Sequence, residues 1–512
     1  MNDSGRAAGR GSGILCDPSV GRICILVLVV LGTAWFALQA WGAVQAYSLD
    51  FDEGVYLQTA LQHARGQQLY SELFLSQPPL LFELWSLLIR LFGNQVFPAR
   101  FTSILFGFAV ILITLHLARS LFDRKTALLA CLLTAINWYL FHEAKVVHTN
   151  MPSLALALLA LYAALRFNLG RSGWWLVLSA CSFALVGTVK LLEVFFIIPI
   201  LFLLLFPLYK DRISRRFRLL HTWPRTVGLY TMVFAALTAG VYLRYPFSPL
   251  VDQVIGLGAA GTLRVTGRAR IIIDAYLGWN LGLSLFTILG LYFTFIENRR
   301  VFIFFTVLIG AQLFFHALMS EWVWHHHLIV LLPVFSILAS AGIVKLVGKL
   351  CTAGTGTVQR MPSEKGIPAG RRRALGTVSV VLFILLAVIP NLAGDVYMHR
   401  EHAGRGAYRE EKELVRLIEK LTDHDDLVVS DELMAVFRAG RSTDGRLVDP
   451  SAKRIRTGSL QEQALLSLGE EPAMVIFWTG RLRSFQRYHR FVAGHYRLIY
   501  QQNKREVYVK KD

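Results

Sequence analysis

The chain has 512 residues, of which 54% are hydrophobic and 17% charged, and its formal net charge at pH 7 is +19. Because about a quarter of the residues of a soluble domain are charged, this composition excludes an ordinary soluble enzyme. The large apolar fraction also excludes a disordered basic tail. A basic excess of this size is typical of a nucleic-acid-binding protein or of the cytoplasmic loops of a membrane protein. The distribution of the charges decides between these two classes.

Apolar runs along the chain predict membrane-spanning helices, each of which needs about 20 mostly apolar residues. The runs cover residues 23–44, 97–117, 127–141, 151–167, 174–189, 191–209, 227–243, 271–296, 301–318, 328–346 and 374–392. The first run is too long for a cleaved signal peptide and lacks a small-residue cleavage site, so it is expected to stay as an anchor. We therefore predict an α-helical polytopic membrane protein with about 11 transmembrane helices, one for each run.

The basic residues predict how the chain is oriented in the membrane. Lysine and arginine are concentrated in the N-terminal tail, residues 1–21, and in every second loop after it, including a Gly-, Thr- and Pro-rich linker at residues 347–373. The positive-inside rule places such loops in the cytoplasm. The chain is thus predicted to be a multi-pass protein of the plasma or inner cell membrane with a cytoplasmic N-terminus. The basic excess then indicates a lipid bilayer as its surroundings and no nucleic acid as a partner.

Residues 22–394 form the predicted transmembrane domain, and residues 395–512 form a predicted exterior domain. In the exterior part, an amphipathic helix is expected at 408–421, short buried strands at 427–430 and 474–478, and a hairpin of 496–500 with 506–509. This pattern indicates an α/β domain, without a dinucleotide fingerprint or a P-loop. Its charged residues suggest either an acceptor-binding surface or, as the preferred interpretation, a solvated surface. They are Asp431, Glu432, Asp449, Arg481, Arg483, Arg487 and Arg490.

The first outer loop, residues 45–96, contains the densest polar pattern of the chain. Asp52 and Glu53 stand at the start of a segment whose apolar residues recur at helical spacing, which predicts a short amphipathic helix along the membrane surface. Two interpretations of the acidic pair are equally open. Asp52 caps this helix, with Glu53 favoured by the helix dipole, or the pair supplies a catalytic carboxylate at the membrane–water boundary.

Lys190 lies between two apolar runs on the predicted outer face, where positive charge is not favoured. A lysine at the end of a span can extend to the interface, but an anionic ligand or Glu193 is the preferred partner. Three adjacent histidines at the start of the tenth span point in different directions on a helix, so a single phosphate-facing or core-facing histidine is expected. Other polar residues predicted on this face are Glu143, Lys145, His148, Asn150, Arg244, Arg264, Arg268 and Arg270.

The predicted outer position of these groups constrains the chemistry. Nucleotide-activated donors are made in the cytoplasm, so an outer site needs an activated group that is carried across the membrane on a lipid. Lysine or arginine would hold the lipid phosphate, which is also a stable anionic leaving group. A carboxylate would act as the base for an acceptor hydroxyl. No cofactor is expected, because the 5 cysteines form no metal-binding cluster and the predicted cytoplasmic loops carry no DxD motif of the nucleotide-sugar transferases.

The first outer loop resembles that of the family 39 glycosyltransferases, which include the protein O-mannosyltransferases and the lipid A aminoarabinose transferases and share the GT-C membrane fold. The matching residues are Asp52-Glu53-Gly54-Val55-Tyr56, Gly66, Tyr70, Gln77-Pro78-Pro79-Leu80, Ala99-Arg100-Phe101-Thr102-Ser103, Gly187-Thr188 with Lys190, and the run from His327 to Pro333. The resemblance covers residues 26–346. It implies a GT-C fold and an inverting transfer of a sugar from a polyprenyl-phosphate donor to a hydroxyl of a protein, lipid or glycan.

The resemblance also implies roles for individual residues. Asp52 would be the general base, and Glu53 would support it or position the acceptor. Residues implied or suggested for the donor phosphate or the substrate are Lys190, Arg100, Arg244, Gln77, His148 and His326. This chain departs from the family at two of these positions. The aminoarabinose transferases carry a phosphate-binding lysine where this chain has Gln77, and an acidic residue is frequent where it has His148-Thr149-Asn150, so the donor sugar is not implied.

Two other classes of function compete with a glycosyltransferase. A transporter or flippase of lipid-linked anions predicts charged or broken helices at mid-membrane and two related halves, and the sequence shows neither. A non-catalytic membrane scaffold is opposed directly only by the acidic pair Asp52-Glu53. The sequence therefore favours a membrane glycosyltransferase with a lipid-linked donor and a hydroxyl acceptor as its partners, in keeping with a reaction that needs no metal ion.

Overall fold

The computed structural model describes residues 18–46, 50–170, 172–208, 223–257, 265–319, 324–352 and 407–511, with a few isolated residues between 378 and 393. Nearly all of the predicted eleventh span lies outside the described residues, as do most of the predicted linker 347–373 and the N-terminal tail up to residue 17.

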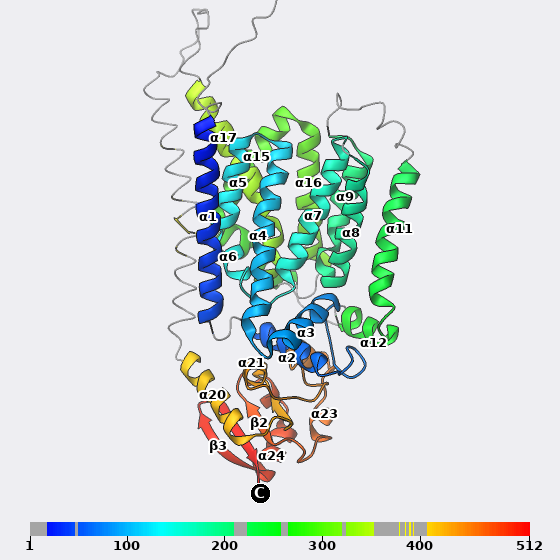
Figure 1. Cartoon of the computed structure of the whole chain (residues 1–512), viewed down its shortest axis with the longest axis vertical. Helices are drawn as coiled ribbons and strands as arrows, with labels where there is room; N and C mark the ends of the chain where they lie inside the picture. Colours follow the sequence, from blue (N-terminus) through cyan, green and yellow to red (C-terminus); the bar gives the residue numbers. More distant parts are fainter. Residues whose placement is uncertain are drawn as a thin grey trace, which may run out of the picture.

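The larger part of the described chain is a bundle of apolar helices (Figure 1). The main helices are α1 (Pro18–Gln45), α4 (Val96–Leu121), α5 (Arg124–Ile136), α6 (Trp138–Glu143), α7 (Asn150–Asn168), α8 (Trp174–Val189), α9 (Ile197–Leu205), α11 (Trp223–Tyr242), α15 (Leu281–Glu297), α16 (Arg299–Phe314) and α17 (Leu332–Thr352). Shorter segments extend or interrupt them: η1 (Leu191–Phe196), α12 (Phe247–Val251), η3 (Asp252–Gly256), α14 (Val265–Ile273), η4 (Asp274–Gly278), η5 (Phe315–Met319) and η6 (His325–Leu331). Each of the first ten predicted runs coincides with one of these helices or with a broken pair of them.

The number of membrane spans is not confirmed. Within the described residues, four helices are long and apolar enough to cross a membrane, or up to six if each of two bent pairs counts as one span. The bent pairs are Pro224–Tyr242 with Phe247–Gly256, at 109°, and Ala269–Gly278 with Leu281–Glu297, at 84°. The prediction of one continuous span at 271–296 is therefore wrong, because the π-helical turn η4 and the bend that follows it interrupt the helix. Broken helices are thus present although the sequence did not indicate them.

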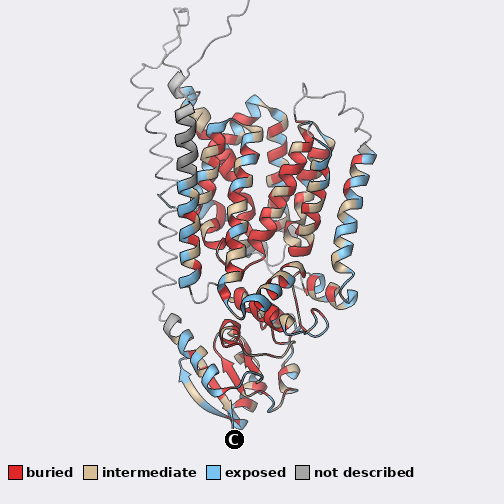
Figure 2. Cartoon of the chain, in the orientation of Figure 1, coloured by how far each residue is buried: buried red, intermediate tan, exposed pale blue. Residues whose placement is uncertain are grey.

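Helices α2 (Phe51–Ala64) and α3 (Leu80–Phe92) lie between the bundle and the C-terminal part of the chain (Figure 1). The short helix predicted at Asp52 and Glu53 is present as α2, but it has no solvent-exposed face over the residues from Glu53 to Gln62, all of which are buried. α3 covers one part of this helix and a helix of the C-terminal domain covers another. Figure 2 shows the buried residues continuing from the bundle through this junction.

Residues 407–511 form a compact α/β unit, which we call the C-terminal domain. Its elements are α20 (Ala407–Leu421), β1 (Val428–Ser430), α21 (Leu433–Arg438), α22 (Ala452–Arg456), α23 (Glu462–Leu466), β2 (Met474–Phe477), η8 (Leu482–Ser484), α24 (Gln486–His495), β3 (Tyr496–Gln502) and β4 (Arg505–Lys510). The sheet has the strand order β1-β2-β4-β3, with β1 parallel to β2 and the other pairs antiparallel. The predicted helix, the two buried strands and the closing hairpin are all found within a few residues of their expected ends.

Two glycines bring the C-terminal domain into near-backbone contact with the first outer loop. A Cβ atom added to Gly54 of α2 would lie 2.6 Å from the backbone nitrogen of Met434 in α21. A Cβ atom on Gly445 would lie 2.1 Å from the carbonyl oxygen of Glu72. Backbone atoms cannot move aside as a flexible side chain can. The Gly54 contact therefore requires a residue without a Cβ atom for α21 to lie directly against α2.

We expect Gly54→Ala to force α2 and α21 apart and to cost about 1–3 kcal/mol, the usual effect of overpacking. The measurement is the thermal unfolding midpoint in detergent. Gly310→Ala is the matched control, because a Cβ atom at this helical glycine meets no atom within 4 Å. A Gly54→Ala variant as stable as the Gly310→Ala variant would contradict the close contact.

Candidate functional site

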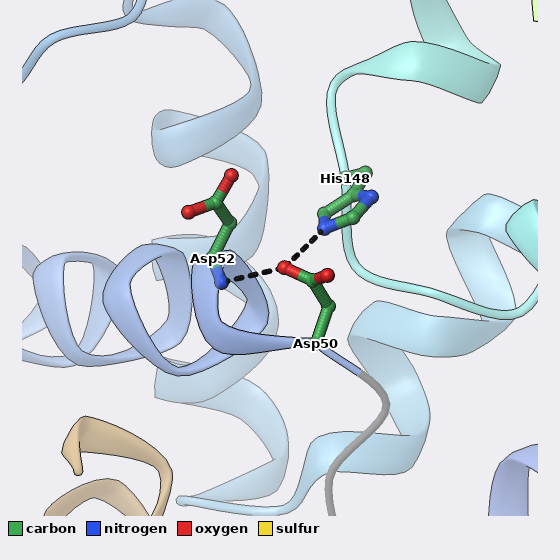
Figure 3. Close-up of side chains that lie close together, drawn as sticks. All are labelled: Asp50, Asp52 and His148. Atoms are coloured by element: carbon green, nitrogen blue, oxygen red, sulfur yellow. Dashed lines mark hydrogen bonds and ion pairs between the residues drawn. The ribbon is translucent and has the colours of Figure 1, made fainter. Parts of the chain in front are cut away.

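Asp52 lies in the first turn of α2, but it does not cap the helix. Asp50 is the N-cap: its Oδ1 accepts a hydrogen bond from the backbone N–H of Asp52 at 2.8 Å (Figure 3). The interpretation of Asp52 as the cap is therefore wrong. Its carboxylate instead lines a cavity between the bundle and the C-terminal domain.

Glu53 and Arg100 form a buried, bidentate ion pair. Arg100 donates from Nε and Nη2 to the two carboxylate oxygens of Glu53, each at 2.7 Å. Its Nη1 donates to the carbonyl oxygens of Ala43 and Ala46 at the end of α1, and the backbone N–H of Val147 donates to Glu53 at 3.3 Å. Neither side chain lines the cavity. The pair joins α1, α2, α4 and the loop before α7, and its position does not support contact of Arg100 with a donor phosphate.

His148 lies between two carboxylates. Its Nε2 is 3.2 Å from Asp50 Oδ1, and its Nδ1 is 3.1 Å from Glu143 Oε2. With a carboxylate at each ring nitrogen, the cationic imidazolium is the favoured form, because it has an N–H to donate on both sides. Burial alone would lower the pKa of His148, but the charges of Glu143 and Asp50 outweigh burial and raise this pKa well above its usual value.

A polar network runs from His148 to Lys190. Asn150 donates from Nδ2 to Glu143 Oε2 at 3.1 Å, and its Oδ1 accepts a hydrogen bond from the ammonium of Lys190. The predicted partner Glu193 is also present, with its carboxylate 4.0 Å from Lys190 Nζ. Lys190 is buried at the break between α8 and η1, and it lines the same cavity as Asp52.

The cavity has a volume of about 750 Å³, which is within the range of small-molecule sites. It brings together five of the eight residues predicted for the site. They are Asp52, Gln77, His148, Lys190 and His326. Glu53 and Arg100 lie behind it as the buried pair. Arg244 is exposed after α11 and does not line the cavity, so its position does not support the phosphate contact predicted for it.

The C-terminal domain supplies part of the cavity wall. Its charged contributions are Asp449, Lys453, Arg456 and Arg481. The guanidinium of Arg481 lies 3.6 Å from the centre of the Phe51 ring, directly beside the start of α2. The interpretation of the predicted charges as a solvated surface is therefore wrong for Asp449 and Arg481, which line the cavity, and for Asp431, which is buried and accepts backbone hydrogen bonds. Lys453 and Arg456 were missed, because a short basic segment carries no signal of its own in the sequence.

The pKa of Asp52 is suited to proton transfer near neutral pH. Burial and the neighbouring charge of Asp50 raise it to about 7, whereas the charges of His148 and Arg481 act in the opposite direction. A carboxylate with such a pKa is ionised often enough to accept a proton and is basic enough to hold it. This combination is the property expected of a general base.

If Asp52 acts as a base, the activity should rise with pH and level off above about 7. Below the pKa, kcat/KM should fall about tenfold per pH unit because only the ionised carboxylate can accept a proton. Asp50→Asn should move this limb to lower pH, because the charge of Asp50 raises the pKa of Asp52. The helix cap should be kept, since asparagine also caps a helix. His148→Gln should move the limb to higher pH. The pH profiles of the three proteins check the order, and shifts in the opposite directions would contradict it.

The same residues form the group best suited to a metal ion among the described parts of the chain. One ligand atom from each of Asp50, Asp52 and His148 lies within 4.8 Å of the others. His148, however, faces carboxylates through both ring nitrogens, and a histidine ligates a metal only through a deprotonated nitrogen. A metal ion here would have to displace a proton from this pairing, and a reaction without a metal stays a prediction.

The chain resembles a known protein family in sequence and solved membrane-protein structures in fold. A family model described as dolichyl-phosphate-mannose-protein mannosyltransferase matches residues 76–251. No curated protein matches the chain. ArnT from Cupriavidus metallidurans in the apo state superposes with a TM-score of 0.63 at 16% identity, over 95% of this chain and 98% of that one. The same protein bound to undecaprenyl phosphate gives 0.61 at 16% identity, over 94% and 97%.

A more distant structure shares the same architecture. The oligosaccharyltransferase AglB from Archaeoglobus fulgidus, in complex with an inhibitory peptide and a dolichol-phosphate, superposes with a TM-score of 0.55 at 13% identity, over 95% of this chain and 74% of that one. The structure and the family model together confirm the resemblance to the family 39 glycosyltransferases and show that this multi-pass membrane protein has the GT-C fold.

Proposed function

We propose that the protein transfers a sugar from a polyprenyl-phosphate donor to a hydroxyl acceptor on the outer face of the cell membrane, with inversion at the anomeric carbon. The observation that carries this proposal is the shared cavity of Asp52 and Lys190. This cavity offers both a carboxylate whose pKa is about 7 and a buried ammonium group.

Each group has a defined part in the proposed reaction. Lys190 holds the phosphate of the donor and stabilises the charge that develops as the bond between the anomeric carbon and the phosphate oxygen breaks. Asp52 accepts the proton of the acceptor hydroxyl as its oxygen bonds to that carbon from the opposite side. A single displacement of this kind inverts the anomeric centre, and the lipid phosphate leaves as a stable anion.

The other predicted residues take supporting roles. Gln77 and His326 line the cavity and are proposed to contact the donor. His148 holds Asp50 at the start of α2 and places a positive charge beside Asp52. Glu53 and Arg100 are proposed to position α2, and Arg244 receives no role.

The relatives support a lipid-linked donor. The ArnT structure is bound to undecaprenyl phosphate, and the AglB structure contains a dolichol-phosphate together with a peptide. The family model that matches residues 76–251 is also described by a dolichyl-phosphate sugar. A polyprenyl phosphate is the component common to all three, whereas their sugars and acceptors differ or are not named.

The proposal is tested with the full chain reconstituted in proteoliposomes. Polyprenyl-phosphate sugars and the corresponding nucleotide sugars are supplied separately, and transfer to hydroxyl acceptors is followed by mass spectrometry. Transfer is expected only from the lipid-linked donors. Transfer from a nucleotide sugar in the absence of a lipid carrier would overturn the donor, and transport of the donor across the bilayer without any transfer would favour a flippase.

Lys190→Ala is expected to raise the KM for the lipid donor at least tenfold, because a charge-assisted hydrogen bond to phosphate contributes about 1.5–3 kcal/mol. Lys145→Ala is the control. Lys145 lies in the loop between α6 and α7, its ammonium lies over the Phe141 ring, and it does not line the cavity. Equal donor KM values for the two variants would show that Lys190 does not bind the phosphate.

A further inference from the structure

The cavity has a second group of basic side chains, at the opposite end from Lys190. Lys190 lies where α8 meets η1, within the bundle. Lys453, Arg456 and Arg481 line the cavity from the C-terminal domain, which lies on the other side of α2 (Figure 1). Asp52, at the start of α2, therefore separates two cationic regions of one cavity.

In α22, one basic residue packs into the domain and two line the cavity. Arg454 is the buried member of this helix: it stacks on Phe74 at 3.4 Å and donates to the backbone carbonyls of Arg446 and Asp449. Lys453 and Arg456 are three residues apart, a spacing that places two side chains on the same face of a helix. The helix thus turns one basic side chain into the domain and the other two toward the cavity.

Basic residues outnumber acidic ones among the residues that the domain adds to the described cavity wall. Asp449 is its one acidic contribution among the described lining residues, against three basic ones. The Asp449 carboxylate accepts hydrogen bonds from the backbone of Ser451 at 3.0 Å and from the hydroxyl of Ser76 at 3.4 Å. Guanidinium groups bind phosphate and carboxylate oxygens in a planar, bidentate geometry. This end of the cavity is therefore suited to an anion.

The position of this group favours the acceptor over the donor. A polyprenyl phosphate reaches the cavity from the lipid bilayer, and its phosphate is assigned to Lys190. The acceptor hydroxyl must lie at Asp52, so the rest of the acceptor extends past Asp52 toward the C-terminal domain.

We propose that Lys453, Arg456 and Arg481 form a second anion subsite, separate from the donor phosphate site, which binds a phosphate or carboxylate group of the acceptor. The acceptor assignment rests on the proposed function, whereas the existence of the subsite does not. The C-terminal domain would then select acceptors that carry a negative charge near the reacting hydroxyl.

The subsite is tested by direct binding to the full chain in nanodiscs of zwitterionic lipid, with undecaprenyl phosphate saturating the donor site. The soluble probes are glycerol 3-phosphate, gluconate and glycerol. We expect an anionic probe to bind and glycerol not to bind, and the comparison of phosphate with carboxylate identifies the preferred group. Lys453→Ala/Arg456→Ala should lower the affinity for the anionic probe at least tenfold and leave the affinity for undecaprenyl phosphate unchanged.

Arg487→Ala/Arg490→Ala is the matched control, because these two exposed arginines on α24 have the same spacing and do not line the cavity. This control should bind the probes like the unmodified protein. Equal anion binding by both double variants would overturn the subsite. A loss of undecaprenyl phosphate binding in Lys453→Ala/Arg456→Ala would assign these cations to the donor instead. A protein that binds the anion but transfers no sugar would refute the proposed function and leave the subsite standing.

Discussion

Asp52→Asn is expected to lower kcat for sugar transfer by about 10²–10⁴, the contribution that a general base usually makes. Asparagine has nearly the shape of aspartate but cannot accept the proton of the acceptor hydroxyl. Single-turnover transfer in proteoliposomes checks the effect, and the affinity for undecaprenyl phosphate should stay unchanged because Lys190 is intact. Asp50→Asn is the matched control, since it removes a carboxylate two residues away and retains the helix cap.

The same substitution should not destabilise the fold. The pKa of Asp52 is raised to about 7 in the folded chain from an ordinary value of 3.8. Protonated Asp52 therefore favours the fold, and this contribution is lost as the pH rises through about 7. At pH 8 asparagine replaces a disfavoured charge, so the thermal midpoint should stay the same or rise. Full transfer by Asp52→Asn would show that another group is the base, and a large drop in the midpoint would make Asp52 a structural residue.

Arg100→Met is expected to lower the free energy of unfolding by about 3–5 kcal/mol, the usual cost of breaking a buried ion pair from one side. The change leaves the Glu53 carboxylate buried without its bidentate partner, and two carbonyl oxygens at the end of α1 lose a donor. The measurement is the thermal midpoint and the yield of folded protein in detergent. Activity should fall together with stability, unlike the selective loss expected for Asp52→Asn.

A second variant separates this structural role from a catalytic one. Arg100→Met/Glu53→Leu removes both charges and should recover much of the lost stability, because replacing both partners of a buried pair by apolar residues is often nearly neutral. Arg100→Lys should not restore the fold fully, since lysine lacks the planar fork that bonds both carboxylate oxygens. An Arg100→Met protein that is fully stable but has lost donor binding would show that Arg100 binds the donor phosphate.

The sequence identified the site residues whose charge is unusual for their place in the chain. Lys190 stood out as a cation on the outer side of an apolar chain, and Asp52 as an acid at the start of a helix, and both line the cavity. Residue spacing alone could not separate the role of Asp52 from that of Glu53. The difference depends on Arg100, 47 positions further along the chain, which is directed at Glu53 and away from the cavity. Spacing along one helix does not reveal which of two adjacent carboxylates has a distant partner.

Most features of the site that the sequence did not reveal depend on how the C-terminal domain packs against the first outer loop. Helix α2 has the apolar spacing of a surface helix, and only the contact between Gly54 and Met434 shows that it is buried between two parts of the chain. Lys453 and Arg456 lie in a short basic segment like many solvated ones, and they reach the cavity because this domain packs against the first outer loop. Tertiary contacts of this kind leave no periodic pattern in the sequence. The bend after η4 was missed for a similar reason, since residues 271–296 are continuously apolar.

The most direct test of the proposed reaction is a structure of the full chain with a polyprenyl-phosphate donor bound. We expect the phosphate to lie within hydrogen-bond distance of Lys190 Nζ, with the anomeric carbon of the sugar between that phosphate and the Asp52 carboxylate. A donor phosphate bound outside this cavity, or a sugar that cannot approach Asp52, would contradict the proposed reaction.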